Sequence, residues 1–362
     1  MIIARQELST LAGKQSLFNP HEDLIIDSFV DQIEQNQLQF VGPQLLLGPL
    51  YDSFGLADLE LGMYFKALVI SRLIYPGSKL KTLSYLKRHH QLEVEIDTIY
   101  RYLDHLDEAT CARIQDQIFA YSRRILGGQT GLLFYDLTTL YFETSQEDEL
   151  RRIGYSKDGK SQHPQIVLGL LLGSQGYPLA YKIFEGNTGE PRTLIPLIES
   201  LQKRYQITQP IIVADAALLS QKNIETLSKE GYQYIIGGRL KNEKETLQQQ
   251  MLAMPIDESH PQQFIHPKGR LVVSYSAKIA KKDQANRKKG LQRLEHKIKS
   301  GKLSKAHLNN RGYNKYLKMQ GEVNIQLDYQ KFEQDKCWEG LKGYITNTAL
   351  SPKTVIDQYS QL

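Results

Sequence analysis

The chain has 362 residues, of which 41% are hydrophobic and 23% charged, and its formal net charge is +5. This composition excludes wholesale disorder and a fibrous chain, and the length predicts two to three domains that each bury a core. No apolar run approaches the ~20 residues that cross a bilayer, and the first residues lack the pattern of a secretion signal.

Residues 1–128 are predicted to be mostly helical. Apolar side chains recur at helical spacing in four stretches, which are 56–74, 80–89, 95–106 and 109–126. Pro76 and Gly77 end the first of these helices, and the pair Gly127 and Gly128 ends the helical region.

Residues 129–240 change to a pattern of strands and helices. Short apolar or alternating runs predict strands, which are 132–138, 165–173, 177–184, 210–215 and 232–236. The turn at 173–178 joins two of these strands as a hairpin. A helix opens at Glu190 and Pro191, and Ser220 caps another. A hairpin that leads into alternating helices and strands predicts an α/β fold with a mixed sheet and helices on its faces.

Residues 241–340 interrupt this alternation and are read as an insertion. The chain then resumes in 341–362 with a strand at 341–346. A final helix begins with Ser351 as its cap and Pro352 at its first position. This helix has no glycine and no basic last turn, so we expect it to be cut short.

A strongly basic segment lies inside the insertion, at residues 268–318. It contains 16 Lys or Arg and only two acids, Asp283 and Glu295, whereas the rest of the chain has a net charge of −9. Such a block suits a polyanion, because each cation placed on a phosphate releases a counterion. A solvated, lysine-rich pair of helices is the alternative interpretation. The residues we assign to DNA contact are Lys281, Lys282, Arg287, Lys288 and Lys289.

Two aspartates have an unusual context. Asp136 interrupts an apolar strand, and Asp215 ends another. A carboxylate in such a strand is costly unless it is paired, hydrogen-bonded or bound to a metal. The two strands can be neighbours in the sheet, so we expect the two acids to converge at one edge of it. Such a pair of oxygen ligands would suit Mg²⁺ or Mn²⁺, which act in phosphodiester chemistry. Alternatively, each aspartate only caps the turn that follows its strand.

Other motifs are less informative. The glycine-rich basic turn at 154–160 either faces a phosphate or is an ordinary loop. No phosphate-binding loop of nucleotide hydrolases occurs, and no histidine spacing matches a zinc site. The two cysteines, Cys111 and Cys337, form neither a disulfide framework nor a metal pair, so we expect a cytoplasmic protein, associated with the nucleoid when bound to DNA.

At these residues the sequence resembles the DDE transposases of bacterial insertion sequences, in the branch with a mostly β insertion. The matching stretches are FYDLTTLYFE at 134–143, GYSKDGK at 154–160, EGNTGE at 185–190 and VADA at 213–216. The resemblance implies a ribonuclease-H-like catalytic core, with Asp136 and Asp215 as the first two catalytic, metal-binding acids. It also implies a helical region that binds DNA ends, Mg²⁺ or Mn²⁺, double-stranded DNA as partner and a homo-oligomer on that DNA.

The chain departs from this branch near its end. The branch signature is Tyr, two residues, Arg, three residues, Glu, six residues and Lys. Tyr359 fits the Tyr and is therefore assigned to DNA contact, but Leu362 stands in place of Arg and the Glu would fall at position 366. We expect a truncated or frameshifted transposase, with Glu333 or Glu339 as alternative third acids. Two other functions remain open: a non-catalytic DNA-binding inhibitor of intact transposase, and a ribonuclease-H-like nuclease.

Overall fold

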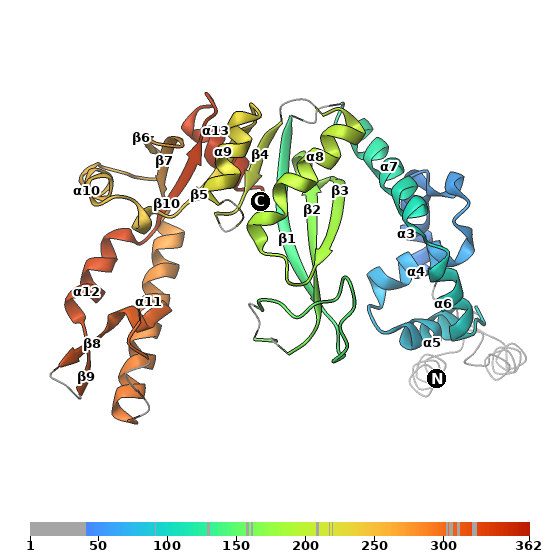
Figure 1. Ribbon diagram of the computed structural model, residues 1–362, viewed down its shortest axis with the longest axis horizontal. Coiled ribbons are helices and arrows are strands. Elements are labelled where there is room, and N and C mark those ends of the chain that lie inside the picture. Colours follow the sequence, from blue (N-terminus) through green and yellow to red (C-terminus); the bar gives the residue numbers. More distant parts are fainter. Residues whose placement is uncertain are drawn as a thin grey trace, which may run out of the picture. The chain divides into compact units, whose positions relative to one another are not determined.

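Figure 1 shows the computed structural model of the chain. The structure describes residues 41–90, 92–128, 131–156, 159–160, 162–207, 210–216, 218, 220–301, 303, 307–309, 312–320 and 324–362. The chain divides into two compact units, Met1–Tyr121 and Ser122–Leu362. Each unit is described by itself.

The described part of the first unit is helical, as the sequence predicts. Its elements are α3 (Gly42–Ser53), η2 (Leu56–Leu59), α4 (Gly62–Ile74), α5 (Lys79–His90), α6 (Ile96–Asp104) and the greater part of α7 (Glu108–Ile125). The expectation of one helix over 56–74 is wrong. The chain turns at Glu60, whose φ of 53° lies in the left-handed region, and so separates η2 from α4. The apolar pattern crosses this turn because Leu56 and Leu61 enter the same core as Tyr51.

The second unit contains an eight-stranded mixed sheet (Figure 1). Its spatial order is β3-β2-β1-β4-β5-β10-β7-β6, and the strands are β1 (Leu132–Tyr141), β2 (Gln165–Leu172), β3 (Pro178–Glu185), β4 (Ile211–Ala214), β5 (Gln233–Gly238), β6 (Gln262–His266), β7 (Gly269–Tyr275) and β10 (Leu341–Thr346). Strands β1, β2 and β3 are antiparallel, whereas β4 and β5 run parallel to β1. The order β3-β2-β1-β4-β5 and the directions of these five strands are those of ribonuclease-H-like folds, so the predicted fold class is confirmed.

Helices cover the faces of this sheet. Helix α13 (Pro352–Tyr359) contacts β4, β5, β7 and β10, and its Val355 joins Phe134 and Val213 in the core. Helices α8 (Leu194–Tyr205) and α9 (Gln221–Lys229) lie on the opposite face (Figure 1). The predicted caps are confirmed, because the Ser220 and Ser351 side chains accept hydrogen bonds from the amides of the third residues after them.

The segment predicted as an insertion contributes to the main sheet as well as forming a separate lobe. Strands β6 and β7 extend the sheet beyond β10 after helix α10 (Glu245–Ala253). The lobe follows, and its elements are α11 (Ala277–Lys299), η7 (Gly312–Tyr316), β8 (Leu317–Gln320), β9 (Asn324–Leu327), α12 (Tyr329–Gln334) and η8 (Asp335–Trp338). The lobe has its own apolar core around Leu294, Tyr316 and Phe332. Within the described residues, no helix has both the length and the apolar character needed to cross a bilayer.

Asp335 has two partners within the lobe and a third, Lys241, in the segment after β5. Its carboxylate accepts a hydrogen bond of 2.7 Å from the Tyr316 hydroxyl, and it pairs with Lys315 and with Lys241, the latter at 3.0 Å. Burial by itself raises the pKa of Asp335, but the hydrogen bonds from Lys315, Tyr316 and Lys241 outweigh it and lower the pKa to about 2. The folded lobe therefore favours the ionised carboxylate.

We predict that Asp335→Asn lowers the free energy of unfolding by about 2 kcal/mol at pH 7, since each pKa unit corresponds to roughly 1.4 kcal/mol. Because the pKa is depressed from 3.8, this stabilisation is present above pH 4 and is lost as the pH falls toward 2. Urea unfolding at pH 7 and pH 3 measures the difference between wild type and variant, which should shrink at the lower pH. The exposed Asp357→Asn serves as control and should change little.

Candidate functional site

The strand register brings Asp136 and Asp215 to the same edge of the sheet. Strands β1 and β4 are parallel neighbours, and their paired residues end with Tyr135 opposite Ala214. Asp136 and Asp215 are the next residues on these two strands. Phe134 and Val213 pack against α13, and each lies two residues before one of the acids. Because side chains two residues apart on a strand point to the same face, both carboxylates belong to the α13 side of the sheet. The convergence expected from the strand order therefore follows from the register.

Both carboxylates are exposed, although the strands that carry them are buried up to the preceding residue. We expected the two acids to lie within buried strands, and the structure corrects this expectation, because both side chains are exposed. Strand β4 ends at Ala214, so β1 has lost one neighbour from Asp136 onward. Each aspartate accepts a hydrogen bond from the amide that follows it, at 2.8 Å for Leu137 and 2.6 Å for Ala216. Cations can therefore reach both carboxylates.

A cleft of 460 Å³ adjoins Asp215. Its walls come from the end of β5, from η5 (Leu240–Asn242), from the start of β10 and from α13. Basic and aromatic side chains line it, namely Arg239, Lys241, Lys342, Trp338, Tyr344 and Tyr359. The three basic residues were not predicted from the sequence. Arg239 follows the end of β5, Lys342 lies at the start of β10 and Lys241 lies in η5, so only the first two have a signal, which is their position at a strand end. A cleft that brings basic side chains next to Asp215 suits a polyanionic strand.

Tyr359 lies between this cleft and the core. Its ring meets the Tyr344 ring edge to face, with the centroids 4.9 Å apart and the planes at 65°. Burial, the negative charge of Asp215 and a hydrogen bond with Asp215 raise the pKa of Tyr359 to about 12, so its hydroxyl is protonated at neutral pH. The assignment of Tyr359 to DNA contact stays a prediction, and Tyr359 lines the same cleft as Asp215.

No third acid joins the pair among the residues that the structure describes, where no group of three His, Cys, Asp or Glu side chains could hold a metal. Glu339 forms a nearly buried ion pair with Arg287, with 2.7 Å between Nε and Oε1. Glu333 lies 3.8 Å from the same guanidinium. Both alternative third acids therefore belong to the lobe.

Helix α11 carries the basic surface on one side. Lys281, Lys282, Lys288 and Lys289 are exposed, and no described residue forms an ion pair with them. At about 100° per residue these lysines share one face of the helix with Arg293. Arg287 points the other way and is only 7% exposed. Its guanidinium donates to the Phe332 carbonyl at 2.8 Å and lies 4.1 Å over the Phe332 ring. The assignment of Arg287 to DNA contact is therefore corrected to a role in the core of the lobe.

The basic turn at 154–160 is described in part, because Lys157 and Asp158 lie outside the described residues. The Ser156 hydroxyl contacts the Tyr141 hydroxyl at 3.0 Å, and the Lys160 ammonium lies 5.2 Å from the centre of the Tyr141 ring. Tyr155 is 82% exposed. The phosphate-facing role of this turn stays a prediction.

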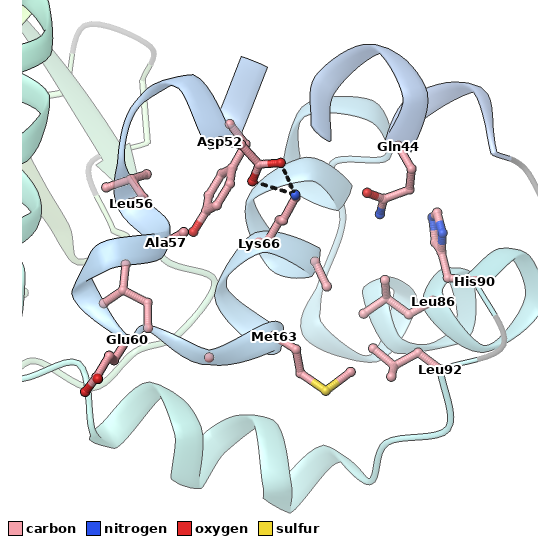
Figure 2. Close-up of a pocket in the computed structure, with 14 residues that line it drawn as sticks. Gln44, Asp52, Leu56, Ala57, Glu60, Met63, Lys66, Leu86, His90 and Leu92 are labelled. Carbon is pink, nitrogen blue, oxygen red and sulfur yellow. Dashed lines mark hydrogen bonds and ion pairs between the residues drawn. The ribbon is translucent and has the colours of Figure 1, made fainter. Parts of the chain in front are cut away.

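The helical unit has a cavity of 690 Å³, which Figure 2 shows. Its lining is mainly apolar and includes Met63, Leu86 and Leu92. The Lys66 ammonium is paired with the Asp52 carboxylate at 2.7 Å (Figure 2). With Asp52 neutralised in this way, the lining does not offer a pair of free carboxylates, and the sheet edge is the better candidate for chemistry.

Comparison with known proteins gives one family match. A family model described as Transposase DDE domain matches residues 127–361. Among solved structures, a piggyBac transposase synaptic complex with hairpin DNA is 15% identical, with a TM-score of 0.28 over 48% of this chain and 38% of that one. A Mos1 transposase paired-end complex with the left transposon end is 14% identical, with a TM-score of 0.21 over 48% of this chain and 58% of that one. Both matches thus span less than two thirds of those chains. No curated protein sequence matches.

Proposed function

The chain belongs to the Transposase DDE domain family, which implies DNA transposition, and from this premise we propose that it is the transposase of an insertion sequence. In this proposal it binds the ends of the element as an oligomer and works in the cytoplasm, at the nucleoid. Its site is built for metal-dependent strand cleavage and transfer, with Asp136 and Asp215 as catalytic residues. The single observation that carries this proposal is the register that sets these two acids side by side at an exposed sheet edge.

The donor set fits a hard divalent cation. Two exposed carboxylates from adjacent strands offer oxygen ligands, which Mg²⁺ and Mn²⁺ prefer. When bound there, such a cation activates a water or a 3′-hydroxyl and stabilises the leaving oxygen during attack on a phosphodiester. Asp136 and Asp215 would hold it as two of its ligands.

The rest of the unit supplies DNA binding. The exposed lysines of α11 would lie on duplex phosphates, and Arg239 and Lys342 would hold the strand that enters the cleft beside Asp215. The chemistry needs no ATP, since one phosphodiester is exchanged for another, and the absence of a nucleotide-binding loop from the sequence is consistent with this.

We propose further that this chain cleaves DNA weakly or not at all. In the described residues no third carboxylate accompanies Asp136 and Asp215, and two ligands hold a cation less firmly than three. A chain that binds ends without cutting them would act as an inhibitor of intact transposase, and the intact basic face of α11 favours this as the second candidate function.

The test is a nicking assay on supercoiled DNA that carries the element's ends, with Mg²⁺ or Mn²⁺. We predict DNA binding in a mobility-shift assay but little or no nicking. Robust nicking that disappears in Asp136→Ala would contradict the proposed inactivity. Metal-dependent cleavage of any DNA, without preference for the ends, would instead favour a nuclease. In either case Asp136→Asn and Asp215→Asn should each weaken Mn²⁺ binding by at least about 10-fold.

A further inference from the structure

We propose that Tyr359 is a positioning residue for Asp215, and that its hydroxyl fixes the orientation in which this carboxylate meets a divalent cation. The inference rests on the proposed function, because it concerns the same metal site. It assigns to Tyr359 a role on the protein's own acid rather than on DNA. Both residues line the same cleft.

The ring of Tyr359 is held firmly. It belongs to the last turn of α13, packs against the core formed by Phe134, Val213 and Val355, and meets Tyr344 edge to face. With the ring fixed on both sides, the hydroxyl has little freedom. Tyr359 lines the same cleft as Asp215, and the protonated hydroxyl is a donor that the carboxylate can accept from.

Gly237 of β5 makes room for this hydroxyl. A Cβ atom at Gly237 would lie 2.6 Å from the Tyr359 hydroxyl oxygen and 3.4 Å from the Ala216 amide nitrogen. The same Ala216 amide donates to Asp215 Oδ1 at 2.6 Å. The Tyr359 hydroxyl and the Ala216 amide therefore both lie close to Gly237, next to Asp215. A side chain at Gly237 would push the Tyr359 hydroxyl away from this position.

The two acids differ in how much support their backbone supplies. Asp136 lies inside β1 and pairs with Leu170 of β2, so the sheet holds its backbone. Asp215 follows the last residue of β4 and belongs to no ladder. A metal ligand on a loop needs a hydrogen bond from a neighbouring group to hold its side chain. In metal sites generally, such neighbouring donors orient the ligands. Tyr359 supplies that bond to Asp215.

The test compares Mn²⁺ affinity of the full chain by calorimetric titration in three variants. Tyr359→Phe removes the hydroxyl and keeps the ring, and Gly237→Ala displaces the hydroxyl without removing it. Tyr344→Phe is the matched control, because this neighbouring tyrosine packs against the Tyr359 ring and its pKa is raised mainly by burial, with no contribution from Asp215. We expect Tyr359→Phe and Gly237→Ala each to weaken Mn²⁺ binding about 10-fold, and Tyr344→Phe to leave it unchanged.

DNA affinity in EDTA separates this role from a DNA contact. Tyr359→Phe should bind DNA like wild type when no divalent cation is present. Wild-type Mn²⁺ affinity in Tyr359→Phe overturns the inference, as does a loss of DNA affinity in EDTA with Mn²⁺ binding unchanged. If Asp215→Asn binds Mn²⁺ as well as wild type, the proposed metal site itself fails. The two failures are thus distinguishable.

Discussion

Replacement of Lys281, Lys282, Lys288 and Lys289 together by alanine is expected to weaken binding to double-stranded DNA about a thousand-fold at 0.1 M salt. Each lysine that lies on a phosphate releases close to one counterion, and its loss removes nearly one unit from the slope of log affinity against log salt. The four lysines are exposed on one face of α11 and have no ion pair with a described residue, so their charges are available to a polyanion. The slope should become shallower by about four.

The control for this variant removes exposed lysines from the opposite face of the sheet. Lys203, Lys222 and Lys229 lie on α8 and α9, away from the α13 side that carries the two acids. Their replacement by alanine also lowers the net charge, but it should change affinity less than 10-fold at the same salt concentration. Equal losses in both variants would mean that only the overall charge matters, and that α11 is not the DNA-binding surface.

Arg287→Ala is expected to lower the free energy of unfolding by about 3–5 kcal/mol. The arginine is nearly buried, its partner Glu339 is equally buried, and the guanidinium also holds the Phe332 carbonyl. Removal of one partner leaves a buried carboxylate without its counter-charge, which is the costly way to break such a pair. Urea unfolding of the full chain measures the change.

Two further variants test whether the broken ion pair causes the loss of stability in Arg287→Ala. The neighbouring Lys288→Ala should leave stability within about 0.5 kcal/mol of wild type and should weaken DNA binding, because Lys288 is exposed. The double variant with Arg287 and Glu339 both replaced by leucine should recover much of the lost stability, since no charge remains buried. A stable Arg287→Ala that has lost DNA affinity would restore Arg287 to the DNA surface and contradict its structural role.

Local patterns in the sequence predicted much of the fold. Serine caps, proline at a first helical turn and runs of apolar residues act within a few positions of the chain, so α9, α13 and the core strands were predictable. The same reasoning failed at Glu60, where a left-handed turn divides two helices that feed one core. Apolar periodicity reports which side chains are buried, and it does not report a turn between two helices that share that core.

For the site, the sequence by itself determined that Asp136 and Asp215 are anomalous acids and that α11 is basic, because residue types in their local context are enough for that. Only the tertiary structure decided which groups meet. The register of β1 and β4 joins acids about eighty positions apart, α13 places Tyr359 in the cleft that Asp215 also lines, and the fold of the lobe turns Arg287 inward to Glu339. Strand pairing and burial depend on partners distant in the chain, and a local pattern contains no information about them.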